Sequence, residues 1–206
     1  MSTDRSARTG RVVALHGFED DPERLAAPLR HLIADAGLAD RWQVIAPRGP
    51  AETPAGPSWF GADGIADPDA VAAAVAAVHE VAAAPDADGA APEGPLVLVG
   101  FSQGGALALA VAHGPVGPAT DALTGVCCLG GFLLSPDDAT YDWEGAPTPT
   151  LLVHGADDDV VDPQQARAGA RALERRGIPV EHCEVATGHH VDATLLAPVV
   201  AWLAGR

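Results

Sequence analysis

A serine stands between two glycines at the point where a predicted strand gives way to a predicted helix. The apolar run LVLV leads directly into GFSQG at residues 100–104, and a helical pattern follows. A nucleophile on so sharp a turn needs neighbours without side chains, because a Cβ there would collide with the adjacent strand or helix. The G-x-S-x-G spacing in this setting predicts that Ser102 is a catalytic nucleophile. A nucleotide-binding turn is the alternative, but the segment lacks G-x-G-x-x-G.

A serine hydroxyl needs a base to take its proton, and that base needs a carboxylate to hold it in one tautomer. The segment TGHHV follows a predicted strand at residues 179–185. His189 comes after a glycine in this strand-to-helix loop, so we predict that it is the base. His190 is expected in the first turn of the next helix. The remaining histidines at 31, 79, 113 and 182 fall on predicted helices or a strand and are expected to be structural.

Candidates for the acid follow the predicted strand 150–153, in the segment HGADDDVVD. Asp158 is our first choice and Asp157 the second, since adjacent carboxylates cannot all point at one imidazole. Asp162 precedes a proline and is expected to cap a helix. A metal site built from His154 and these aspartates is an alternative, but the spacing favours no particular ion. The predicted chemistry needs neither a metal nor an organic cofactor.

Acyl transfer also requires donors for the negative charge that develops on the carbonyl oxygen. The residue after the nucleophile supplies one, which is the backbone N–H of Gln103. The loop after the first strand reads LHGFEDD, and we expect the N–H of Phe18 to supply the other. His16 is expected to brace this loop rather than to react.

Short apolar runs alternate with longer helical patterns along the chain, and the runs do not alternate apolar with polar residues. Such strands are typical of a parallel sheet covered by helices on both faces, so we predict a doubly wound α/β fold. The expected strands are 11–15, 42–46, 96–99, 125–129, 150–153 and 179–185. The expected helices are 21–36, 68–84, 103–113, 163–176 and 191–204.

The 206 residues fit one domain, which we place at 11–206 after a short polar extension at 1–10. The formal net charge of −16 argues against nucleic-acid partners. No segment looks like a secretory signal or a membrane span, so a cytoplasmic protein is expected. The cysteines at 127, 128 and 183 show no zinc-ligand spacing, and the first two are expected to be buried and reduced.

Taken in order, the segments LHGFEDDPERL, SWF, VGFSQGGALAL, LLVHGADDDVV and GHHV resemble the phospholipase/carboxylesterase group of α/β-hydrolases. This group includes small bacterial carboxylesterases and acyl-protein thioesterases. The resemblance implies a minimal α/β-hydrolase fold and a Ser102-Asp158-His189 triad, with the Phe18 and Gln103 amides as the oxyanion hole. It also places the acid at the fifth residue of H-G-x-x-D. Only about ten residues precede the first strand, so the family's opening antiparallel strands are expected to be shortened or absent.

About twenty residues separate the strands ending at 129 and beginning at 150, too few for a separate cap domain. We therefore expect an open, shallow site. The long connection 47–66 differs from the family's usual substrate loop but keeps two aromatic residues. The residues expected to wall the site are Phe18, Trp59, Phe60, Phe132 and Leu133.

The resulting hypothesis is a serine hydrolase, a monomer or homodimer, that acts on a small-molecule ester or thioester. An acyl-protein thioesterase or lysophospholipase activity is the nearest alternative. An acyltransferase, a peptidase and a non-catalytic binding module on the same fold are weaker ones.

Overall fold

The computed structural model describes residues 9–61, 67–85, 89, 92–114, 122–134 and 147–206. Its main feature is a six-stranded sheet with the spatial order β2-β1-β5-β6-β7-β8, in which every neighbouring pair is parallel. The strands are β1 (Gly10–Leu15), β2 (Trp42–Ile45), β5 (Leu96–Phe101), β6 (Leu123–Leu129), β7 (Thr150–Gly155) and β8 (Val180–Val185). Because all six run in one direction, the loops after their carboxyl ends gather at one edge of the sheet.

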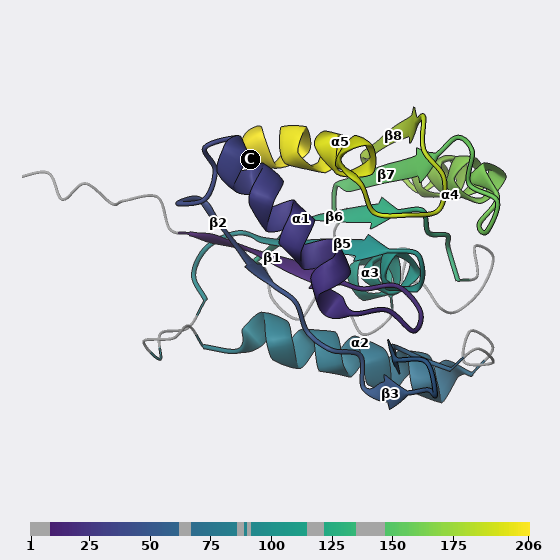
Figure 1. Ribbon diagram of the computed structural model, residues 1–206, viewed down its shortest axis with the longest axis horizontal. Helices are drawn as coiled ribbons and strands as arrows, with labels where there is room; N and C mark the ends of the chain where they lie inside the picture. Colours follow the sequence, from purple (N-terminus) through teal and green to yellow (C-terminus); the bar gives the residue numbers. More distant parts are fainter. Residues whose placement is uncertain (1–8, 62–66, 86–88, 90–91, 115–121, 135–146) are drawn as a thin grey trace, which may run out of the picture.

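Helices cover both faces of this sheet (Figure 1). Successive β1 residues point to opposite faces: Val12 belongs to one apolar cluster and Val13 to the other. The first cluster contains side chains of α1 (Pro22–Asp35) and α5 (Ala193–Ala204). The second contains side chains of α2 (Pro68–Ala83), α3 (Gln103–His113) and α4 (Pro163–Arg175). The predicted doubly wound α/β class is therefore confirmed.

Three helices begin in the same way, with an aspartate cap followed by a proline. The carboxylates of Asp21, Asp67 and Asp162 accept backbone N–H groups at the starts of α1, α2 and α4. These side chains satisfy donors that lack a partner within the helix, and proline loses nothing at the first position. The cap predicted at Asp162 is confirmed.

The last helix begins two residues later than predicted. The Asp192 side chain accepts the N–H of Leu195, which fixes the start of α5 at Ala193. His190 therefore lies before the helix. The prediction that it belongs to the first turn is wrong. Its Nε2 is 3.0 Å from Thr187 Oγ1 and 3.1 Å from Asp192 Oδ2.

The long connection after β2 contains a small antiparallel hairpin that the sequence did not predict. Its strands are β3 (Ala51–Glu52) and β4 (Pro57–Ser58). Two-residue strands carry no readable period, so only the length of this connection signalled that it has structure of its own.

Parts of three predicted segments lie outside the described residues. They are 1–8 of the N-terminal extension, 62–66 of the long connection, and 135–146 of the segment between residues 129 and 150, which is too short for a cap domain. Within the described part of the chain, no helix is both long and apolar enough to cross a membrane. Cys127 and Cys128 are buried and unpaired, as expected.

Candidate active site

Ser102 occupies the turn between β5 and α3, and its backbone conformation is one that residues other than glycine rarely adopt. Its φ is 53° and its ψ is −116°. The turn is possible because the flanking residues are glycines: a Cβ on Gly100 would lie 2.0 Å from the carbonyl oxygen of Gly104. A Cβ on Gly104 would lie 2.1 Å from the carbonyl oxygen of Leu15. The turn thus needs glycine on both sides of a serine held in a strained position.

The structure brings Ser102, Asp158 and His189 together from three different loops. His189 Nε2 lies 3.0 Å from Ser102 Oγ, and His189 Nδ1 lies 2.7 Å from Asp158 Oδ2. A carboxylate can only accept, so Nδ1 carries the proton and Nε2 is free to accept from the serine hydroxyl. The ring of Phe101 packs against the imidazole, with centroids 4.9 Å apart. This is the geometry in which an imidazole can remove the serine proton.

Asp158 is held by donors on both carboxylate oxygens. Oδ1 accepts the backbone N–H groups of Val160 at 3.0 Å and Val161 at 2.8 Å, while Oδ2 accepts from His189. Burial alone would raise the pKa of this carboxyl, but the hydrogen bonds from His189, Val161 and Val160 outweigh it. The pKa of Asp158 consequently lies below its ordinary value. Its neighbour Asp157 is exposed and does not contact His189 through any described hydrogen bond.

The loop after β1 reaches the nucleophile, as expected for an oxyanion loop. A Cβ on Gly17 would lie 3.7 Å from Ser102 Cβ. His16 is fully buried beneath the loop: its Nδ1–H donates to the Gly17 carbonyl at 2.7 Å, and its Nε2 accepts the Gly49 N–H at 2.9 Å. Burial lowers the pKa of this imidazole. His16 thus braces the loop in the way the sequence suggested. The oxyanion role of the Phe18 and Gln103 amides remains a prediction.

The side chain of Gln103 has a structural function that the sequence did not indicate. Its Oε1 accepts the Trp59 N–H at 3.0 Å, and its Nε2 donates to the Phe60 carbonyl at 2.7 Å. The residue after the nucleophile therefore ties the connection 47–61 to the nucleophile turn. A buried amide can satisfy two backbone groups at once, but its partners are 43 and 44 residues away, so no local pattern reveals them.

Three of the residues expected to wall the site are buried instead. Trp59 and Phe60 are each 1% exposed, and Leu133 is 6% exposed. The Trp59 indole stacks on His16, and its Nε1–H donates to the His16 carbonyl at 3.0 Å. These side chains pack into the core instead of forming an exposed wall, and their contact with a substrate remains a prediction. Phe132 is half-buried, and its contact with substrate remains a prediction.

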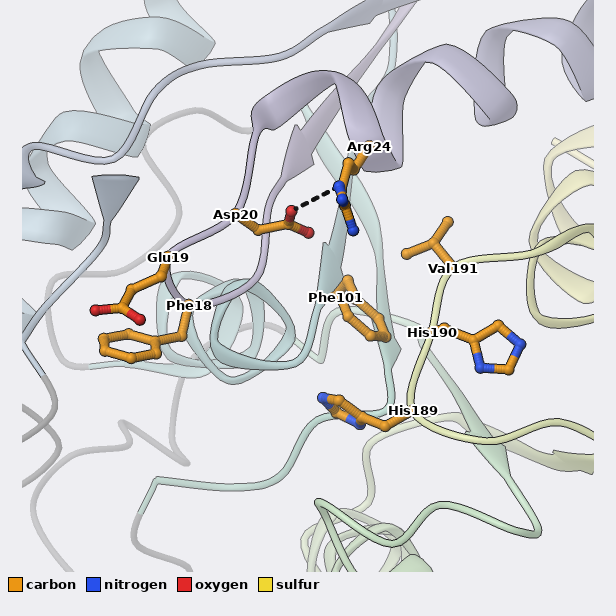
Figure 2. Close-up of a pocket in the computed structure, with 8 residues that line it drawn as sticks. All are labelled: Phe18, Glu19, Asp20, Arg24, Phe101, His189, His190 and Val191. Atoms are coloured by element: carbon orange, nitrogen blue, oxygen red, sulfur yellow. Dashed lines mark ion pairs between the residues drawn. The ribbon is translucent and has the colours of Figure 1, made fainter. Parts of the chain in front are cut away.

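A hollow of about 410 Å³ adjoins His189. It lies between the loop after β1 and the loop before α5, and Figure 2 shows its walls, including the ion pair of Asp20 with Arg24. Phe18, which is 38% exposed, lines it, and its contact with a substrate remains a prediction. The lining residues are Phe18, Glu19, Asp20, Arg24, Phe101, His189, His190 and Val191. Among the described residues, no group of three or more histidine, cysteine or acidic side chains could hold a metal ion.

Comparison with known proteins gives a consistent result. A family model described as Phospholipase/Carboxylesterase matches residues 2–204. The crystal structure of esterase PE8 is similar, with 26% identity, a TM-score of 0.79, and coverage of 97% of this chain and 93% of that one. SOBER1 from Arabidopsis thaliana has 24% identity and a TM-score of 0.75, with 97% and 99% covered. Acyl-protein thioesterase 2 from Zea mays has 23% identity and a TM-score of 0.72, with 98% and 95% covered. At these identities the two plant proteins support the fold alone.

Proposed function

The chain belongs to the phospholipase/carboxylesterase family, and we propose that it is a serine hydrolase cleaving carboxylic esters of small to medium acyl groups. Family membership supports hydrolysis of ester or thioester bonds. The observation that carries the finer proposal is the continuous hydrogen-bonded series from Ser102 Oγ through His189 to Asp158. The esterase PE8, the neighbour at 26% identity, favours the ester over the thioester.

In the proposed first step, His189 Nε2 takes the Ser102 proton while Oγ attacks the carbonyl carbon of the ester. The backbone N–H groups of Phe18 and Gln103 hold the negative charge that forms on the carbonyl oxygen. His189 then donates its proton to the leaving oxygen, and the alcohol departs from an acyl-serine. Asp158 holds the imidazole in the required tautomer and stabilises its positive charge.

In the second step, His189 removes a proton from water, and the resulting hydroxide attacks the acyl-serine carbonyl. Return of the proton to Ser102 Oγ releases the carboxylic acid and regenerates the enzyme. The leaving group must lie beside His189 to receive its proton, and the hollow at that residue offers the space. One methylene changes selectivity by only about 1–3 kcal/mol in an apolar site, so we expect a gradual dependence on acyl length.

The direct test measures hydrolysis of p-nitrophenyl acetate and butyrate by the parent protein and by Ser102→Ala. We expect the replacement to remove nearly all turnover while circular dichroism shows an intact fold. A Ser102→Ala protein that is folded and still cleaves these esters at the parent rate would refute the proposal.

A series of acyl chains of increasing length, each offered as an ester and as a matched thioester, then defines the substrate class. A higher kcat/KM for the esters supports our proposal. A consistent preference for the thioesters would replace it with a thioesterase. Acyl transfer to added alcohols or thiols in place of hydrolysis would identify an acyltransferase.

A further inference from the structure

A second imidazole touches the carboxylate of Asp158. His154, on the penultimate residue of β7, is fully buried, and its Nε2 lies 3.2 Å from Asp158 Oδ2. The same Nε2 lies 2.8 Å from the carbonyl oxygen of Val161. Asp158 Oδ2 is also the atom that accepts from His189 Nδ1. Two histidines, one buried and one at the site, therefore converge on a single carboxylate oxygen.

The contacts of His154 fix its tautomer. Both oxygens near Nε2 are acceptors, so Nε2 carries a proton, which it donates to the Val161 carbonyl at 2.8 Å, with Asp158 Oδ2 3.2 Å from the same nitrogen. The other ring nitrogen, Nδ1, is buried and has no hydrogen-bond partner among the described residues. If the proton were on Nδ1, that buried N–H would have no acceptor. The deprotonated Nε2 would then face two oxygen atoms with its lone pair, which is also unfavourable. His154 is thus built to donate from Nε2.

We propose that His154 is a positioning residue for the reaction: its Nε2–H holds the Val161 carbonyl of the 156–161 loop and lies beside Asp158 Oδ2, the oxygen that accepts from His189. This assignment rests on the proposed hydrolase function. The N–H bonds from Val160 and Val161 hold only Oδ1, so the carboxylate could still turn about that anchor. The contact from His154 restrains Oδ2, the oxygen that orients the imidazole of His189.

The same contact withdraws negative charge from the oxygen that faces His189. A polar N–H close to a carboxylate oxygen stabilises the ionised acid and reduces its attraction for a second positive group. Without His154, Oδ2 would attract the protonated form of His189 more strongly. Removing His154 should therefore move the acidic limb of the pH–activity profile to higher pH.

Few other charged groups face His154. Its register partner on β8 is Glu184, which is paired with Arg167 of α4, and His182 lies further down the same strand. The neighbouring elements β6 and α5 carry no charged side chain. Glu184, Arg167 and His182 stay unchanged in the variants below, so a change in pH profile would report on the contact with Asp158.

The first measurement uses the parent protein and does not depend on catalysis. Long-range proton–nitrogen NMR spectra distinguish the two neutral tautomers of a histidine ring. At pH 8 we expect His154 to carry its proton on Nε2 and to have a bare Nδ1. A proton on Nδ1 would overturn the proposal even if the protein proves to be an active esterase.

The second measurement compares His154→Leu, which removes the donor, with His154→Gln, which keeps an N–H near the same position. For His154→Leu we expect the acidic limb of the kcat/KM profile to move to higher pH, with KM close to the parent value because His154 touches no substrate. Each full unit of that movement lowers kcat/KM about tenfold at a pH below the limb. His154→Gln should return the limb toward the parent position.

His113→Gln is the matched control, because His113 is also a buried imidazole: it is the last residue of α3, and its Nε2 lies 3.1 Å from the Thr150 hydroxyl at the opposite end of β7 from His154. It should lower stability without moving the limb. The proposal is wrong if the limb stays in place in His154→Leu, or if Gln and Leu move it equally. The His189 ring titration followed by NMR gives the same comparison in a protein without measurable turnover, which separates failure of this proposal from failure of the proposed function.

Discussion

Two adjacent aspartates, Asp157 and Asp158, have the same chemistry but different surroundings. Asp158 is buried and bonded to His189 at 2.7 Å, whereas Asp157 is exposed. We predict that Asp158→Asn lowers kcat by about four orders of magnitude, because an amide favours the wrong tautomer of the imidazole. Asp157→Asn should retain the parent kcat. Steady-state hydrolysis of p-nitrophenyl butyrate measures both, and an equal loss in the two variants would contradict the assignment.

At the scale of single residues, the sequence indicated which residues come together at the site, but not which way each side chain faces. The structure brings Ser102, Asp158 and His189 within hydrogen-bond distance, as their positions after strands suggested. Trp59 and Phe60 were expected to face a substrate, but they face the core, because a long loop also needs apolar anchors. Nothing in the local sequence separates these two uses of an aromatic side chain.

At the scale of elements, the turn at Ser102 stores strain. A non-glycine residue at this φ and ψ destabilises the folded state by about 1–3 kcal/mol. Glycine offsets part of this advantage, because its more flexible unfolded chain lowers the free energy of unfolding by about 0.4–1 kcal/mol. We therefore predict that Ser102→Gly is more stable than Ser102→Ala by about 1 kcal/mol. Both variants lack the hydroxyl, so denaturant unfolding of the pair isolates the backbone contribution. An alanine variant as stable as the glycine variant would show that the turn is not strained.

The elements themselves were largely readable from the sequence. The central strands β5 and β7 are buried, largely apolar runs, and four helices begin at aspartate caps, so both kinds of boundary have a local cause. The edge strand β8 is an exception, because it carries charged residues and its side chains are exposed or half-buried. The hairpin of β3 and β4 could not be read, because its pairing is fixed by distant contacts. The Thr53 hydroxyl donates to Glu19 Oε1 at 2.6 Å, and a Cβ on Gly56 would lie 2.8 Å from the Glu19 carbonyl oxygen.

At the scale of the whole molecule, buried His113 links stability to pH. Burial lowers the pKa of His113 to about 4, while an unperturbed histidine has a pKa near 6.5. Between these values the unfolded chain binds a proton that the folded protein does not, so the free energy of unfolding falls as the pH drops. We predict a loss from this residue of up to about 3 kcal/mol between pH 6.5 and pH 4.

Denaturant unfolding at several pH values, in the parent protein and in His113→Gln, measures this contribution. The replacement should flatten the dependence of stability on pH across that interval, whatever its effect at pH 7. Parallel curves for the two proteins would show that His113 does not titrate differently in the folded and unfolded states.

The central claim is that Ser102 is a nucleophile activated by His189. A fluorophosphonate probe tests it most directly, because the probe forms a covalent bond with a serine only where a base activates the hydroxyl. Intact-mass and peptide-mass analysis should find one adduct, located on Ser102, and none in the Ser102→Ala variant. A folded parent protein that gains no adduct, or an adduct that persists in Ser102→Ala, would contradict the account.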